Sequence, residues 1–190
     1  MSLLVLGLVL FLGVHSVSIV APAWRDAQAA RNEKAWKGIY TLVSLAGFAL
    51  LVYGYGVARQ TPVVVYAPPT WTRHLALLLM VPVFPLLLAA YLPGRIKTVT
   101  KHPMLVATKL WAVAHLLANG NLAHVVLFGS FLLWGVANFI AARKRDRAQG
   151  VVYAAGTRYG TVQTVVVGVG AWVLFAFWLH GWIIGIRPIG

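Results

Sequence analysis

The chain has 190 residues, of which 61% are hydrophobic and 10% are charged, and its net charge is +13. A soluble domain of this length carries about 25% charged residues, so the composition indicates a membrane protein. Only three residues are acidic, which leaves almost no material for paired-carboxylate catalysis. The lack of cysteine excludes disulfides and thiolate metal sites. The basic residues are confined to short loops, which argues against nucleic-acid binding.

Six apolar segments in chain order predict six membrane-spanning helices, because about 20 apolar residues cross a hydrocarbon core of about 30 Å. The first segment lacks a basic start, so we expect it to be retained as a helix rather than removed as a signal peptide. Pro82 and Pro85 predict a kink in the third segment. The expected helices cover residues 2–21, 37–58, 72–92, 103–118, 122–142 and 161–184.

The sequence therefore predicts an all-α fold, a polytopic integral membrane helix bundle of about six transmembrane helices that forms a single domain over residues 1–190. Lys and Arg gather in three connections, which are expected to be loops: residues 22–36, residues 93–102 and the basic stretch after residue 142. Positively charged loops of membrane proteins face the cytoplasm. This rule predicts a multi-pass protein with both termini outside.

Small residues recur on one helical face of the second segment. That face combines Tyr40 and Leu51 with small side chains at Ser44, Gly47, Gly54 and Ala58. Membrane helices pack closely where small residues let their backbones approach. The pattern predicts that another helix packs on this face.

Histidine is the residue type through which this chain could carry chemistry, and its six histidines differ in depth. Four stand at predicted helix ends, where interfacial water can satisfy an imidazole: His74, His102, His124 and His180. His15 and His115 lie deeper, where the neutral, metal-ligating imidazole is favoured. A rise of about 1.5 Å per residue places His15 about 10 Å and His115 about 18 Å from the inner boundary, a mismatch of about 8 Å.

Each deep histidine shares a helical face with residues that suit a flat cofactor. On the face of His15 these are Gly7, Phe11 and Ser18; on the face of His115 they are Thr108, Trp111 and Asn119. Gly7 would let a bulky ligand or another helix come close. An apolar, aromatic surface with a few polar groups suits haem held between helices. The alternatives are histidines that join helices by hydrogen bonds or that transfer protons.

Several separated blocks, in family order and covering essentially the whole chain, resemble the NnrU family. They are LGLVLFLGVHSVSIVAPAWR, WKGIYTLVSLAGFALLVYGYG, KHPMLVATKLWAVAHLLANG, LLWGVANFIAARKRDR and LHGWIIGIRP. The resemblance implies a bacterial inner (cytoplasmic) membrane protein. It also implies an association with denitrification, in particular with the production of active nitrite and nitric oxide reductases.

The NnrU family is also related to plant 15-cis-zeta-carotene isomerase, a membrane enzyme whose haem b iron is held by two histidines. The first of these lies in a His-Ser motif, which His15-Ser16 resembles. The second follows a His-Pro pair by thirteen residues, and His102-Pro103 followed by His115 has this spacing. The resemblance implies His15 and His115 as axial haem ligands. A second rank of cofactor-binding candidates comprises Trp111, Asn119, His102, His74 and His180.

Three hypotheses of function stay open. The chain is a haem-b-binding protein that supports denitrification, a haem-dependent cis-trans isomerase of a carotenoid-like polyene, or a membrane scaffold without a cofactor. The expected partners are the lipid bilayer, a lipid-soluble small molecule or nitric oxide, and membrane proteins of denitrification. No nucleic acid is expected among them.

Overall fold

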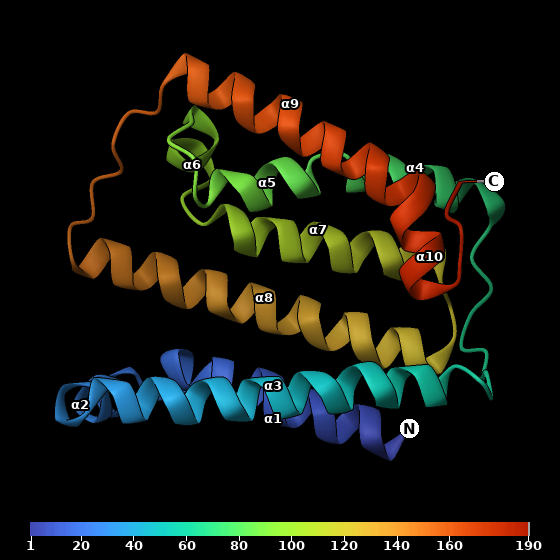
Figure 1. The fold of residues 1–190 in the computed structure, drawn as a ribbon, viewed down its shortest axis with the longest axis horizontal. Coiled ribbons are helices and arrows are strands. Elements are labelled where there is room, and N and C mark those ends of the chain that lie inside the picture. The colour runs from blue at the N-terminus through green and yellow to red at the C-terminus, as the bar shows by residue number, and fades with distance from the viewer. Residues whose placement is uncertain (190) are drawn as a thin grey trace. The chain divides into compact units, whose positions relative to one another are not determined.

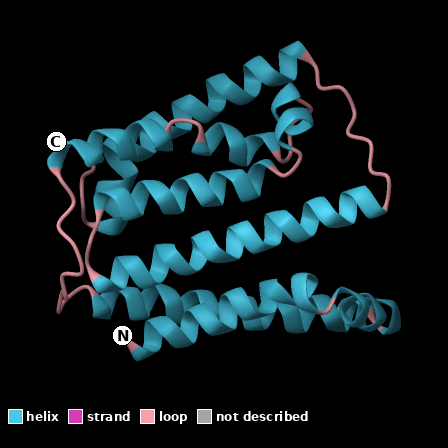
Figure 2. Ribbon diagram, turned by 180° about the vertical axis from the view of Figure 1, so that it is seen from behind, coloured by secondary structure: helices cyan, strands magenta, loops and turns pink. Residues whose placement is uncertain are grey.

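The computed structural model describes residues 1–189, and every regular element within them is a helix (Figure 2). Strand-type pairing occurs in this range only as isolated bridges, such as Val64 with Asn121. The elements are α1 (Ser2–Val20), α2 (Pro22–Arg31), α3 (Glu33–Ala58), α4 (Thr70–Met80), α5 (Val83–Ala89), α6 (Arg95–Thr100), α7 (Pro103–Ala118), α8 (Leu122–Ala148), α9 (Arg158–Leu174), the π-helical turn η1 (Phe175–Leu179) and α10 (His180–Ile184). Figure 1 labels the α-helices.

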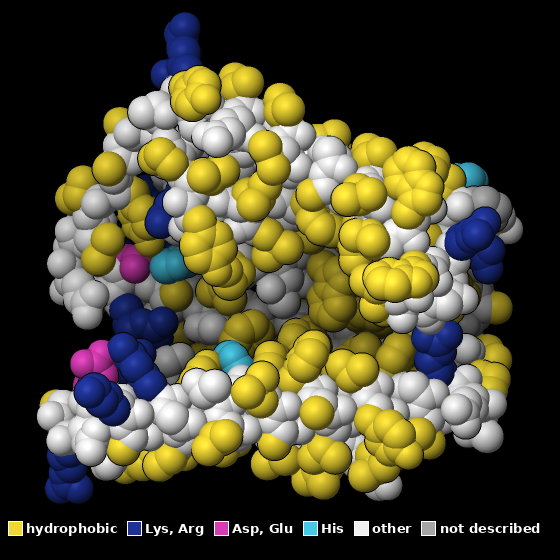
Figure 3. Space-filling model, in the orientation of Figure 1, with side chains coloured by type: hydrophobic (Ala, Val, Ile, Leu, Met, Phe, Trp, Pro, Cys, Tyr) yellow, Lys and Arg dark blue, Asp and Glu magenta, His cyan; other side chains and the backbone are white. Residues whose placement is uncertain are grey.

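The predicted helical membrane bundle is confirmed. Within residues 1–189, five stretches are long and apolar enough to cross a membrane: α1, α3, α4 with α5, α8, and α9 with its continuation to Ile184. The helix α7 is apolar but shorter, with 16 residues. Large apolar side chains such as Leu42 (69% exposed) and Tyr53 (65%) point outward, as lipid-facing residues do. Hydrophobic side chains dominate the face seen in Figure 3, and many Lys and Arg side chains stand near helix ends.

The chain divides into two compact units, each described here by itself. Unit 1 comprises Met1–Ala67 and Asn119–Ala141, and unit 2 comprises Pro68–Ala118 and the chain from Ala142 onward. The interpretation of residues 1–190 as a single domain stays a prediction.

In unit 1, α1 and α3 pack side by side with their backbones in close approach (Figure 1). A Cβ added to Gly7 would lie 2.3 Å from the Leu51 nitrogen, and one added to Gly54 would lie 2.4 Å from the Leu4 nitrogen. Only glycine fits at such distances. The predicted packing face of α3 is therefore confirmed, and its neighbour is α1. Residues near the start of α1 contact residues near the end of α3, so the two helices are antiparallel.

In unit 2, α5 packs against α7 and α9. The hydrophobic core of unit 2 includes Val83, Leu86 and Ala107. The chain turns between α4 and α5 at Val81 and Pro82, which confirms the predicted kink. At Gly168 of α9 an added Cβ would lie 2.5 Å from the Pro85 nitrogen, so α5 and α9 also touch through their backbones.

The three predicted loops contain helix instead. Residues 22–31 form α2, which begins at Pro22, a residue that fits the first helical turn. Then Asn32 accepts a hydrogen bond from the Ala35 nitrogen at 3.0 Å and starts α3 four residues before the predicted position. The basic stretch after residue 142 continues α8, because Arg, Lys and Ala are good helix formers. The third loop contains the short helix α6.

Candidate functional site

His15 on α1 is held by its own helix. Its Nδ1 lies 2.6 Å from the carbonyl oxygen of Phe11, four residues earlier. A carbonyl only accepts hydrogen bonds, so Nδ1 carries the hydrogen and the ring lone pair is on Nε2. This arrangement orients metal-ligating histidines and fixes their tautomer. The half-buried ring contacts Phe11 at 4.3 Å and Tyr40 at 5.2 Å between centroids.

A cavity of about 370 Å³ lies beside His15, within unit 1. Ligand pockets have volumes in this range and above, and combine apolar walls with a few polar groups. The ring of Trp134 lies edge-on to His15 at 6.2 Å, and among the described residues its buried Nε1 has no hydrogen-bond partner. The cavity is lined by Val14, His15, Val17, Ser18, Arg25, Trp36, Lys37, Tyr40 and Thr41.

His115 on α7 repeats the arrangement within unit 2. Its Nδ1 lies 2.8 Å from the carbonyl oxygen of Trp111, again four residues earlier, and the two rings lie 5.3 Å apart. The lone pair of this half-buried imidazole is therefore also on Nε2. The predicted face of α7 thus brings Trp111 to His115. His15 and His115 belong to different units, so their joint ligation of one iron stays a prediction.

His102 was expected to be satisfied by water, and this expectation is wrong. Its Nε2 lies 2.8 Å from the Asp146 carboxylate, and the side chains of the pair are only 21% and 15% exposed. The Tyr153 hydroxyl donates to the same carboxylate at 2.7 Å, and the Arg143 guanidinium lies 3.8 Å from it. Burial, together with the hydrogen bond to Asp146 and its charge, raises the pKa of Tyr153 to about 12, although Arg143 opposes the shift.

The backbone before this cluster is strained. Lys101 has a φ of 65°, which is rare for a residue with a side chain, and its Nζ stands 4.8 Å from the centre of the Tyr153 ring. The corner at residues 101–103 therefore starts α7 from a backbone held by contacts to Asp146 near the end of α8 and to Tyr153 in the segment that follows it.

The remaining candidates make contacts of their own. His74 is exposed on α4, and Nδ1 of His180 lies 2.6 Å from the Ile186 carbonyl oxygen. Asn119 accepts a hydrogen bond at its carbonyl from the Tyr66 hydroxyl at 2.9 Å, within unit 1. The expectation for His124 is wrong: it is only 8% exposed, its Nδ1 has no hydrogen-bond partner among the described residues, and the Tyr55 ring covers it edge-on at 5.6 Å.

The sequence prediction missed three ionisable residues. Asp146 and Tyr153 escaped notice because their link to His102 spans more than 40 residues. A lone acid within the most basic stretch was the available signal. Lys109, half-buried in the middle of α7, was detectable as a charge within an apolar helix.

The nitrogens at His15 and His115 are a donor set that haem accepts. Within residues 1–189 no group of three or more His, Asp or Glu residues could hold a metal ion by itself. In unit 1, the His15 imidazole, the aromatic rings around it and the cavity beside it have the chemistry that suits a porphyrin rather than a bare metal ion.

Comparison with known proteins places the whole chain in one family. The family model described as NnrU protein matches residues 3–188. No curated protein and no solved structure matches the chain. The chain therefore belongs to the NnrU family.

Proposed function

We propose that this NnrU-family membrane protein binds haem b, with His15 and His115 as the axial ligands. The observation that supports the proposal is their shared arrangement, in which Nδ1 donates to the carbonyl four residues earlier and Nε2 keeps the lone pair. The family resemblance further leads us to propose the bacterial inner membrane as its location. Its role there is to support production of active nitrite and nitric oxide reductases during denitrification.

The chain's own residues would orient the ligands and control their surroundings. Hydrogen bonds to the Phe11 and Trp111 carbonyls hold both imidazoles in place. The aromatic rings near His15, including Tyr40 and Trp134, provide surroundings of low polarity. Haem would supply an iron centre that changes oxidation state, and nitric oxide would bind that iron only in place of one imidazole.

The optical spectrum of the full chain, purified in detergent after expression with ample haem, tests this proposal. We expect a Soret band, and we expect His15→Ala and His115→Ala each to shift or abolish it. His74→Ala tests an alternative ligand: His74 is exposed on α4, and if His15 and His115 hold the iron its spectrum should match the wild type. A protein without a Soret band would overturn haem binding. A Soret band that neither alanine variant changes would overturn the ligand assignment and move it to His74, His102 or His180.

The two alternatives predict different results. A haem-dependent isomerase of a polyene would change the cis/trans profile of pigments when expressed in a carotenoid-producing strain. A scaffold without cofactor would lack the Soret band, and the two alanine variants would lower its thermal stability without loss of function.

The proposed partners are the lipid bilayer, a lipid-soluble molecule or nitric oxide, and denitrification membrane proteins. Copurification of a tagged chain with nitrite or nitric oxide reductase from denitrifying cells tests the last of these.

A further inference from the structure

The lining of the cavity beside His15 combines different kinds of side chain. His15, Trp36 and Tyr40 contribute rings, and Ser18 and Thr41 contribute hydroxyl groups. Arg25 from α2 and Lys37 from α3 contribute the two cations of its lining. Their side chains are 46% and 71% exposed, whereas His15 is half-buried. The cavity thus joins a metal-ligating nitrogen and aromatic rings with two positive charges near solvent.

This combination matches an amphiphile that carries a flat apolar body and acidic groups at one edge. Guanidinium and ammonium groups bind carboxylates by charge-assisted hydrogen bonds. We propose that Arg25 and Lys37 bind the two propionate carboxylates of haem b, while His15 ligates the iron. The inference rests on the proposed haem binding and deepens it, because it assigns the cations that recognise the acidic edge.

Both cations already have carboxylate partners, which would be competitors. Arg25 donates to Asp26 through Nε and Nη2. Lys37 pairs at 2.6 Å with Glu33, which lies one turn earlier in α3. Exposed pairs of this kind contribute little to stability, because water screens them. A propionate can replace such a partner with a bond of the same chemistry. Neutralising Asp26 or Glu33 should therefore strengthen haem binding, whereas neutralising Arg25 or Lys37 should weaken it.

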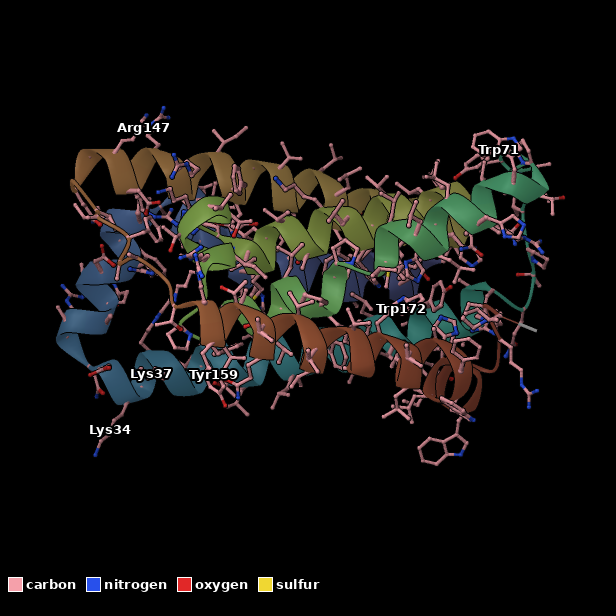
Figure 4. The ribbon with its side chains drawn as sticks, turned by 90° about the horizontal axis from the view of Figure 1, so that it is seen from above. Lys34, Lys37, Trp71, Arg147, Tyr159 and Trp172 are labelled. Carbon is pink, nitrogen blue, oxygen red and sulfur yellow. The ribbon has the colours of Figure 1, made fainter. Side chains whose placement is uncertain are left out.

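Lys34 supplies a matched control. It lies on the first turn of α3, three residues before Lys37, and it is exposed but does not line the cavity. Figure 4 shows its side chain extending away from α3. Lys34→Gln removes the same charge as Lys37→Gln from the same helix, so the pair separates propionate binding from a general loss of positive charge.

The experiment compares two probes, haemin and haemin dimethyl ester, whose propionates are esterified and uncharged. Each is titrated into the full-length protein purified from haem-limited cells, and the Soret absorbance is followed. We expect the wild type to prefer haemin. We expect Arg25→Gln and Lys37→Gln each to weaken haemin binding about two- to fivefold and to leave binding of the ester unchanged. Asp26→Asn and Glu33→Gln should tighten haemin binding, and Lys34→Gln should have no effect.

Charge-keeping variants guard against a folding defect, because Arg25→Lys and Lys37→Arg should retain the preference for haemin. Equal affinity for the two probes, or equal loss in Lys34→Gln and Lys37→Gln, would overturn the propionate assignment while haem binding itself still stands. Loss of copurified phosphatidylglycerol in Arg25→Gln without a change in haemin affinity would also overturn it, and would assign the cations to a lipid headgroup. Failure of both probes to bind would overturn the assignment together with the proposed function.

Discussion

At the scale of residues, the cluster around Asp146 shows how a single acid can organise a basic region. Its carboxylate meets His102, Tyr153 and Arg143. A partly buried carboxylate is stable when several donors share its charge. The cluster fixes the corner at residues 101–103, and His115 stands thirteen residues beyond His102 on the helix that begins there. We therefore regard the cluster as the anchor of α7.

Titration of Tyr153 tests this anchor. The pKa of its phenol is raised to about 12, so the hydroxyl keeps its hydrogen bond to Asp146 well above the ordinary tyrosine pKa of about 10. Because the folded pKa is the higher one, the contribution of Tyr153 to stability is complete below pH about 10 and is lost as the pH rises toward 12.

The measurement is tyrosinate absorbance against pH, with Tyr153→Phe subtracted to isolate this phenol. We expect a midpoint near 12 for the wild type and a midpoint closer to 10 for the variant Asp146→Asn, which lacks the carboxylate charge. A wild-type midpoint near 10 would contradict the hydrogen bond.

At the scale of elements, the contact between α1 and α3 depends on the absence of side chains. A methyl group at Gly54 would overlap the backbone at Leu4. Gly56, two residues further along α3, has no atom within 4 Å of such a group. The two positions share a helix and differ in their neighbours, so they form a natural pair for comparison.

We expect Gly54→Ala to destabilise the protein by about 1–3 kcal/mol, the usual range for overpacking. Gly56→Ala should be neutral or stabilising by up to about 1 kcal/mol, because alanine is the better helix former. Thermal unfolding in detergent, followed by circular dichroism, measures both. Equal melting temperatures for the two variants would show that the backbones do not touch at Gly54.

The positions of the apolar helices could be predicted from the sequence, whereas most of their polar ends could not. Apolar length located α1 and α7, and proline located the turn at Pro82. The helix α2 was missed because its composition is polar and it is only 10 residues long.

The candidate site was predicted only in part for a similar reason. The position of His15 and His115 within long apolar segments pointed to them, because the run of apolar residues around each histidine is visible in the local sequence. The cations Arg25 and Lys37 became part of a site only when the fold placed them around the cavity. Tyr153 meets His102 across 51 residues, and no local pattern encodes such a pairing.

At the scale of the whole molecule, the distribution of charge predicts how the chain crosses the membrane. The loop between α3 and α4 should face outward, and the segment that follows α8 should face the cytoplasm. The native chain has no cysteine, so a single introduced cysteine reports its own position without background.

We expect a membrane-impermeant maleimide to label Thr61→Cys in intact spheroplasts. Gln149→Cys should react only after lysis. Both positions are exposed, so a difference in labelling reflects the side of the membrane rather than burial. The unmodified chain is the control and should remain unlabelled. The reverse labelling pattern would place the termini in the cytoplasm.

The residues that line the cavity beside His15 are all synthesised early. All of its lining residues fall between Val14 and Thr41, within α1, α2 and the start of α3. Chains are inserted from the N-terminus as they are synthesised, so this lining leaves the ribosome before α4 exists. A ligand can therefore bind this cavity at an early stage of biogenesis, when the first helical hairpin is in the bilayer and the later helices are still being made.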